Sequence, residues 1–235
     1  YNTGQILKEH DKPWSWNYTI VLAVLKPDLV IILPEHENMQ DYLAELGIKY
    51  MVVKNKKVSD IIDTIITIGR VCGAEKRAKE LVKNLKSRIQ MIQQKTKDLS
   101  KPRVLISIGR TMGSGSLKDV YITGGNTYFD ELLSYAGGRN AFESNNMEYP
   151  VLSAEGFLHL NPDIIIDMVP DIEKRGLNEN MVLKEWESIS GIEAVRNNRV
   201  YVLSKDYSVI PGPRFIMLLE DLARIIHSEI EWDKM

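Results

Sequence analysis

The clearest hydrophobic pattern in the chain lies between Glu75 and Leu99. Apolar side chains recur there at intervals of three and four residues, namely Ala78, Leu81, Val82, Leu85, Ile89 and Ile92. This spacing places them on one stripe of an α-helix. Lys and Arg crowd the other faces, which we interpret as solvated rather than as a binding patch. Residues 100–102 (SKP) end the segment, so the pattern predicts one helix of about 37 Å over residues 75–99.

A second pattern occurs once on each side of this helix. Residues 25–32 read LKPDLVII and residues 160–167 read LNPDIIID. Each copy follows an apolar, helix-like run, and the proline ends that helix before a short continuous apolar stretch. Such a stretch is typical of a buried parallel strand. The repeat predicts two related α/β lobes, although helix-Pro-Asp-strand joints are also common in unrelated α/β proteins.

The remaining patterns extend this alternation of strands and helices. Further strands are predicted at Ile48–Val53, Arg103–Ile108 and Arg199–Leu203, and further helices within 124–136, 186–198 and 214–228. Residues 109–116 are predicted to form a Gly/Ser loop. Alternating strands and helices indicate parallel sheet with right-handed crossovers. We therefore expect an N-terminal lobe over residues 1–74, a linking helix over 75–99 and a C-terminal lobe over 100–235.

Composition narrows the classes of function. The chain has 235 residues and a net charge of −2, so nothing favours nucleic-acid binding. One cysteine, Cys72, excludes an internal disulfide or a thiolate cluster, and we expect it to be a small core residue. The longest apolar runs are too short to span a bilayer. The first residue is Tyr1, which we expect to reflect removal of an upstream segment such as a signal peptide.

Two polar segments follow predicted strands and are candidate ligand contacts. Glu35 and His36 come directly after the strand at 29–33, at the sheet edge where open α/β sheets bind ligands. The alternative, which the acidic residues favour, is a polar helix N-terminus. Arg110 lies in the sequence GRTMGSG, which lacks the lysine of a P-loop. Its guanidinium could pair with a carboxylate, phosphate or hydroxamate, or form a surface salt bridge.

Other candidates are aromatic, sulfur-containing or basic. Trp14 and Trp16 could stack on a flat or macrocyclic ligand, or simply pack in a poorly patterned segment. Ligand contacts are also expected at Met112, Tyr121, Tyr207 and Arg214. No Ser-His-Asp, Cys-His or H-E-x-x-H arrangement is recognisable, so no catalytic residue and no enzyme activity are predicted.

Several segments together resemble the cobalamin/iron-siderophore class of ABC-transporter substrate-binding proteins, whose lobes are joined by a helical backbone. The matching segments are LKPDLVI at 25–31, LGIKYMVV at 46–53, IGRVCGAEKRA at 68–78, TGGNTYFDELLSYAGGRNA at 123–141, YPVLSAEGFLHLNPDIII at 149–166 and RVYVL at 199–203. Their order and spacing cover the chain from about Pro13 to Ile226. No single motif is decisive alone.

The resemblance implies an extracytoplasmic protein that binds its ligand in the cleft between the lobes and delivers it to a membrane permease. It implies that Glu155, seven residues before Pro162, docks to a permease arginine. The matching position of the first lobe is Ile20, which cannot make a charge-assisted bond, so docking at two points is in doubt. Three families of ligand are implied, namely ferric siderophores, haem and cobalamin, with no intrinsic cofactor.

Different candidate residues favour different ligands among these three. Trp14 is similar in position to a ligand-stacking tryptophan of cobalamin-binding members, which favours a corrin. Arg110 and Tyr121 are the kinds of residue that hold an anionic ferric siderophore or haem. A bare metal ion is disfavoured, because a histidine-rich ligand set is absent.

The resemblance also implies that the first lobe is incomplete. Family members usually begin with a strand, a helix and another strand ahead of the segment that matches Pro13, and only twelve residues precede it here. We expect either a truncated lobe or one completed by another chain through an exposed sheet edge, as in a homodimer. Two alternatives remain, namely a two-lobed enzyme such as a metal chelatase or nucleotide-dependent transferase, and a degenerate member that acts through protein contacts.

Overall fold

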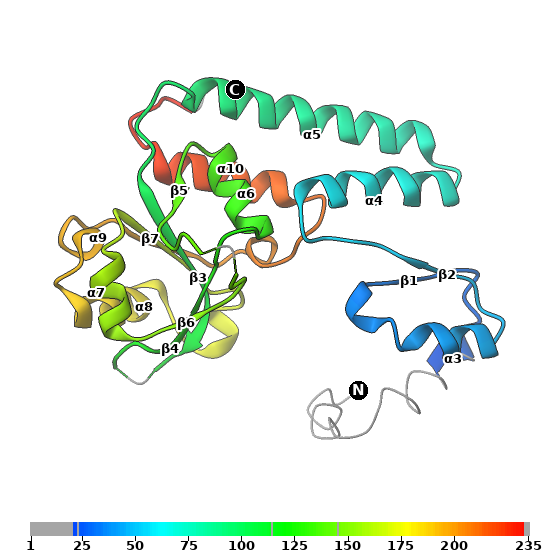
Figure 1. The fold of residues 1–235 in the computed structure, drawn as a ribbon, viewed down its shortest axis with the longest axis horizontal. Coiled ribbons are helices and arrows are strands. Elements are labelled where there is room, and N and C mark those ends of the chain that lie inside the picture. Colours follow the sequence, from blue (N-terminus) through cyan, green and yellow to red (C-terminus); the bar gives the residue numbers. More distant parts are fainter. Residues whose placement is uncertain (1–20, 23, 114, 145, 233–235) are drawn as a thin grey trace. The chain divides into compact units, whose positions relative to one another are not determined.

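The computed structural model describes residues 21–22, 24–113, 115–144 and 146–232 (Figure 1). The chain divides into two compact units, Tyr1–Lys54 and Asn55–Met235. The division therefore lies earlier than the expected end of the first lobe at residue 74. The predicted mixed α/β class is confirmed, since both units contain a sheet with helices.

The first unit contains a two-stranded parallel sheet. Strand β1 (Val30–Ile32) pairs with β2 (Tyr50–Val52), and helix α3 (Met39–Glu45) connects them. Both strands lie inside the predicted ranges, and Ile32 and Leu43 are buried between sheet and helix. Completion of this lobe by another chain stays a prediction.

The second unit begins with two antiparallel helices, α4 (Val58–Val71) and α5 (Glu75–Thr96), which lie side by side in Figure 1. The predicted long helix is confirmed as α5, with Ala78, Val82, Leu85, Ile89 and Ile92 buried along one stripe. Leu81 is exposed, because it lies at the border of this stripe. Cys72 directly follows α4 and is exposed, so the expectation of a small core residue is wrong. The two helices approach closely at Gly69, where an added Cβ atom would lie 2.4 Å from the Cβ atom of Ala78.

A six-stranded mixed sheet forms the centre of the second unit. Its strands are β3 (Arg103–Thr111), β4 (Lys118–Ile122), β5 (Arg139–Asn140), β6 (Val151–Leu152), β7 (Ile164–Met168) and β8 (Val200–Leu203). The order is β6-β4-β3-β7-β8, and β5 also pairs with β3. Strands β7 and β8 belong to the predicted parallel part, and β5, which was not predicted, also runs parallel to β3.

One edge of this sheet contradicts the expectation of parallel strands. Strand β4 runs antiparallel to β3, and β6 runs antiparallel to β4. A short loop is enough to join antiparallel neighbours, whereas a parallel pair needs a longer crossover. The predicted loop at 109–116 is correspondingly shorter, because Gly109, Arg110 and Thr111 continue β3.

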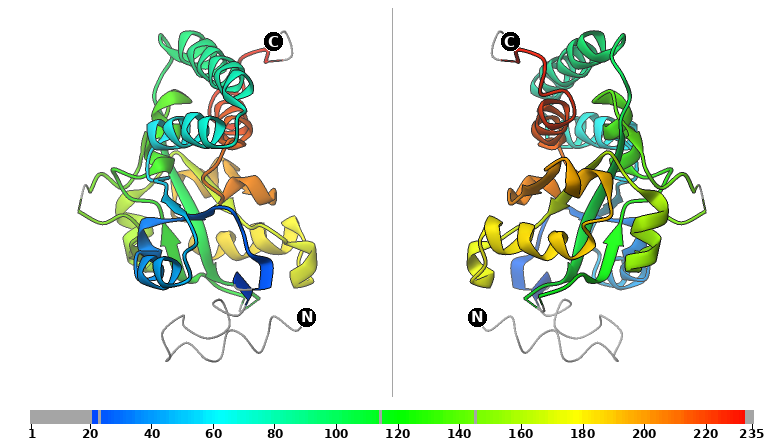
Figure 2. Two further views of the ribbon diagram at one scale, coloured as in Figure 1. Left: turned by 90° about the vertical axis from the view of Figure 1, so that its right-hand side faces the viewer. Right: turned by 90° about the vertical axis from the view of Figure 1, so that its left-hand side faces the viewer.

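Helices cover both faces of the sheet. On one face α5, α6 (Tyr128–Tyr135) and α10 (Phe215–Ile226) pack on side chains that include Val104 and Ile106. On the other face α7 (Ala154–Leu160), α8 (Glu179–Trp186) and α9 (Glu193–Arg196) pack around Leu105 and Ile165. Figure 2 shows α10 on one side of the strands and α8 (yellow) on the other. Strands buried on both faces explain the continuous apolar runs of the sequence.

Short 3-10 helices complete the connections, at Pro34–His36, Glu173–Arg175, Glu187–Ile189 and Asp206–Ser208. No helix in the described part of the chain is both long enough and apolar enough to cross a lipid bilayer.

Candidate functional site

The parallel strands β3, β7 and β8 end at the same edge of the large sheet. The loops that follow their carboxyl ends are the usual place for ligands in open α/β sheets. Of the predicted contacts in the second unit, Met112, Tyr207 and Arg214 follow these strand ends. Tyr121 lies on the neighbouring strand β4.

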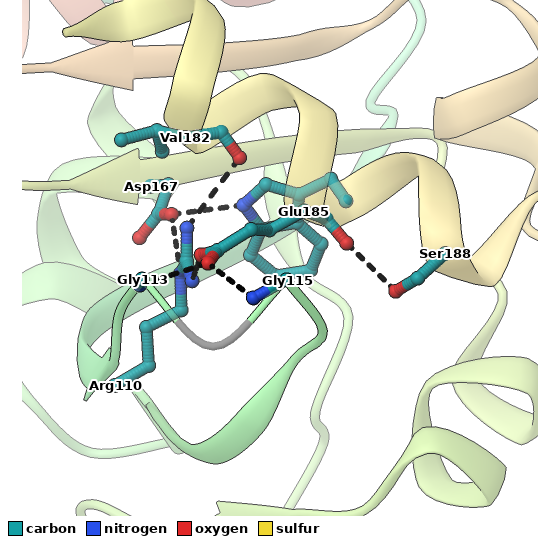
Figure 3. Close-up of polar contacts among 8 residues, drawn as sticks. Arg110, Gly113, Gly115, Asp167, Val182, Glu185 and Ser188 are labelled. Atoms are coloured by element: carbon teal, nitrogen blue, oxygen red, sulfur yellow. Dashed lines mark hydrogen bonds and ion pairs between the residues drawn. The ribbon is translucent and has the colours of Figure 1, made fainter. Parts of the chain in front are cut away.

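A buried ionic network lies beneath the loop that follows β3 (Figure 3). The Arg110 Nε atom donates to Asp167 Oδ2 at 2.9 Å, and its Nη1 atom donates to Glu185 Oε2. Trp186 Nε1 donates to the same Asp167 oxygen at 2.8 Å. The side chains of Arg110 and Asp167 are fully buried, and that of Glu185 is 9% exposed.

The second carboxylate oxygen of Glu185 faces the backbone of the loop. Glu185 Oε1 accepts hydrogen bonds from Gly113 N at 2.8 Å and from Gly115 N at 3.3 Å. Burial disfavours the charged carboxylate, but the bonds from Arg110 and from the two glycine N–H groups outweigh burial and lower the pKa of Glu185. Glu185 is therefore ionised at neutral pH and ties β3, the following loop and α8 together.

This geometry corrects both expectations for Arg110. A surface salt bridge is wrong, because its side chain has no exposed area. A ligand contact is also not available in this arrangement, because the two carboxylates already occupy the guanidinium. Burial disfavours the charged guanidinium, but Asp167 and Glu185 outweigh burial and raise the pKa of Arg110. Arg110 thus supports the loop from within the protein.

The end of β8 carries a polar cluster in which Asp206 and Arg214 are exposed and Tyr207 is buried. Arg214 Nη1 and Nη2 donate to the two carboxylate oxygens of Asp206 at 3.1 and 2.8 Å. The Arg214 guanidinium carbon lies 6.0 Å from the centre of the Tyr207 ring. The Tyr207 hydroxyl donates to Asp221 Oδ2 at 2.7 Å, and burial together with this carboxylate raises the pKa of Tyr207 to about 12. The structure therefore brings Tyr207 and Arg214 together, but Tyr207 is buried in the core and its hydroxyl is bound to Asp221, so the expected ligand contact at Tyr207 is not available in this arrangement.

An exposed apolar patch lies at the antiparallel edge of the sheet. Tyr121 on β4 is directly opposite Val151 on β6, so both side chains lie on one face of the sheet. Met147 and Tyr149 are also exposed in the segment that leads into β6. These four residues form what we call the edge patch.

The backbone around the edge patch is tightly constrained. Gly124 N donates to the carbonyl oxygen of Glu148 at 2.7 Å. A Cβ atom at Gly124 would lie 1.8 Å from the carbonyl oxygen of Met147, so a side chain there would displace the segment. Lys56 Nζ also forms an ion pair with Glu148 at 3.1 Å. Sequence reasoning identified Tyr121 but missed Met147, Tyr149 and Val151, although the apolar residues on both sides of Pro150 were a signal of an exposed edge strand.

The remaining predicted residues lie elsewhere. Glu35 and His36 are in the 3-10 helix that follows β1 in the first unit, and their role as ligand contacts stays a prediction. Glu155 is exposed in the first turn of α7, where Ser153 Oγ caps the helix by accepting a bond from Gly156 N at 3.2 Å. Trp14, Trp16 and Ile20 lie outside the described residues. Within the described ranges, no group of three His, Cys, Asp or Glu side chains could hold a metal ion.

Comparison with known proteins agrees with this fold. The chain matches the model of the periplasmic binding protein family over residues 7–207. It is 30% identical over 235 residues to an uncharacterised ABC transporter substrate-binding lipoprotein of Bacillus subtilis, covering 95% of this chain and 69% of that protein. It is 20% identical over 203 residues to the vitamin B12-binding protein of Vibrio vulnificus, covering 86% of this chain and 69% of that protein.

A solved structure gives the same result for the fold. The haem complex of IsdE from S. aureus superimposes with a TM-score of 0.72 at 23% sequence identity, covering 89% of this chain and 80% of that chain. The resemblance recognised in the sequence is thereby confirmed, and the family consists of substrate-binding proteins rather than enzymes. The chain belongs to the periplasmic binding protein family.

Proposed function

We propose that this protein is the extracytoplasmic substrate-binding component of an ABC importer and that its cargo is a large iron chelate or a corrinoid. The observation that carries the proposal is the family match over residues 7–207, which includes residues of both compact units. The relative with 30% identity is itself named as an ABC transporter substrate-binding lipoprotein, which supports both the importer and the location outside the cytoplasm.

The cargo is inferred from the relatives and from the edge patch. One relative binds vitamin B12 and one structural neighbour holds haem, and both ligands are flat macrocycles around a metal. Tyr121 and Tyr149 place two exposed aromatic side chains on the second unit, and aromatic rings stack well on flat ligands. Burial and the neighbouring Glu148 raise the pKa of Tyr149, so its ring presents a neutral phenol at physiological pH.

Ligand-dependent stabilisation tests this proposal. A ligand that binds only the folded protein stabilises it by about 2.7 kcal/mol at a hundredfold excess over Kd. We expect the melting temperature to rise with haem, a ferric hydroxamate siderophore or cyanocobalamin, and not with the iron-free siderophore. If none of the three shifts the melting temperature at saturating concentration, the proposed cargo class is wrong.

Glu155 provides a test of the permease partner. We expect Glu155→Ala to reduce uptake of the cargo in cells, because an exposed carboxylate that pairs with a permease arginine would be lost. Affinity for the cargo should not change. Glu179→Ala is the matched control, since Glu179 is likewise exposed in the first turn of a helix of the same unit. Equal uptake by both variants would reject Glu155 as a docking residue.

A further inference from the structure

The two oxygens of the Glu185 carboxylate serve different parts of the protein. One is bound by Arg110, and the other accepts the N–H groups of Gly113 and Gly115. We propose that Glu185 is a positioning residue for ligand binding, which holds the turn carrying Gly113 and Gly115 in its binding-competent shape. The proposal rests on the proposed function, because the turn follows the carboxyl end of β3, where ligands bind in such sheets.

The turn that carries Gly113 and Gly115 needs hydrogen bonds to hold its conformation, and we call the Glu185 carboxylate that accepts them the anchor. Gly113 and Gly115 have φ angles of +78° and +73°, which only glycine adopts readily. A Cβ atom added to either residue would touch nothing within 4 Å, so the φ angle and not a close approach of neighbouring atoms is what requires glycine here. Fixing a glycine in one conformation is entropically costly. Hydrogen bonds from both amides to one charged oxygen offset that cost, since bonds to ionised groups are stronger than neutral ones.

The anchor itself is rigidly placed. Glu185 projects from α8, and its partner Arg110 projects from β3. Arg110 is bonded in turn to Asp167 on β7 (Figure 3). Asp167 also accepts the Trp186 N–H group. The carboxylate is therefore fixed by three elements of the second unit. Because the pKa of Glu185 is lowered, the anchor stays charged at neutral pH.

The turn and α8 enclose a hollow on the surface of the second unit. Its lining includes Gly113, Gly115, Leu177, Met181 and Val182, with Glu185 at one side. If the turn that lines the hollow is already ordered before the ligand binds, less conformational entropy is lost on binding. Both oxygens of Glu185 are bound within the protein, so release of the turn would lower affinity for the cargo through the shape of the hollow.

Glu185→Gln tests the proposal with almost no change in side-chain volume. An amide can direct its oxygen at Arg110 or at the glycine N–H groups, but it cannot serve both. We expect hydrogen exchange at Gly113 and Gly115 to accelerate by at least about tenfold. We expect affinity for the chelate that stabilises the wild type to fall by about three- to tenfold. Glu185→Asp withdraws the carboxylate by one methylene and should release the turn similarly, which covers the case that Glu185→Gln does not fold.

Trp186→Phe is the matched control within the same network. It removes the bond to Asp167 but leaves Glu185 attached to the turn, so the melting temperature should fall while glycine exchange and affinity stay as in the wild type. Unchanged exchange in Glu185→Gln, or faster exchange with unchanged affinity, would overturn the proposal. Failure of the proposed function gives a different result from failure of this proposal. In that case the wild-type protein would bind neither haem nor the ferric siderophore nor cyanocobalamin, whatever the exchange rates of the two glycines.

Discussion

Arg110→Met should lower the free energy of unfolding by about 3–5 kcal/mol, because it leaves buried carboxylates without their cation. The side chains of Asp167 and Glu185 are 0% and 9% exposed, so water cannot replace the guanidinium. Only the Trp186 N–H group would still donate to Asp167 among the described residues, since the Oδ1 atom of Asp167 accepts no bond there. Methionine fills a similar volume, which limits the effect of a cavity.

Chemical denaturation of the variant at neutral pH measures this loss. Arg214→Met is the control, because Arg214 is also paired with a carboxylate but both partners are largely exposed, so stability should barely change. A variant in which Arg110, Asp167 and Glu185 are all replaced by apolar residues should recover much of the loss, because no buried charge then remains unpaired. Equal stability of the Arg110 and Arg214 variants would show that the network is not buried as described.

Gly137→Ala should cost about 2–5 kcal/mol, the sum of a backbone and a packing penalty. Gly137 follows α6 with a φ angle of +80°, where an L side chain is strained. A Cβ atom there would lie 2.6 Å from Thr96 Cβ and 2.7 Å from His227 Nε2. Both neighbours are buried, at the end of α5 and the end of α10, so neither can move aside easily.

Gly176→Ala separates the two penalties. Gly176 has a φ angle of +68°, but an added Cβ atom would meet nothing within 4 Å. Only the backbone penalty of about 1–2 kcal/mol applies there. In thermal and denaturant unfolding, the Gly137→Ala variant should have a clearly lower free energy of unfolding than the Gly176→Ala variant. If the two lose the same stability, the close packing of α5, α6 and α10 around Gly137 is not as observed.

Local patterns predicted much of the fold. The stripe of apolar residues placed α5 within a few residues of its observed ends, because every third or fourth side chain is buried. The short apolar runs placed β7, because a strand buried in a sheet needs apolar side chains on both faces. Similar runs placed β1, β2 and β8, although Ile31, Tyr50 and Val52 of the two-stranded sheet are exposed. The antiparallel edge was missed, since the Gly-rich segment after β3 does not indicate whether a hairpin or a crossover follows.

The candidate site depended on contacts that no local pattern contains. Arg110 is 57 residues from Asp167 and 75 residues from Glu185 in the chain, so its burial between two acids follows only from the pairing of β3 with β7 and the packing of α8. Tyr207 and Arg214 are only seven residues apart and lie together after β8, but the burial of Tyr207 follows from its bond to Asp221 on α10, which the sequence did not predict.

Direct binding of the cargo tests the central claim most directly. Purified protein should be dialysed to equilibrium against cyanocobalamin, haem and a ferric hydroxamate siderophore, and bound cobalt or iron measured against protein. We predict that at least one of the three is retained saturably at one equivalent per chain, and that the iron-free siderophore is not. If folded protein retains none of them at saturating concentration, the account of this chain as a carrier of iron chelates or corrinoids is wrong.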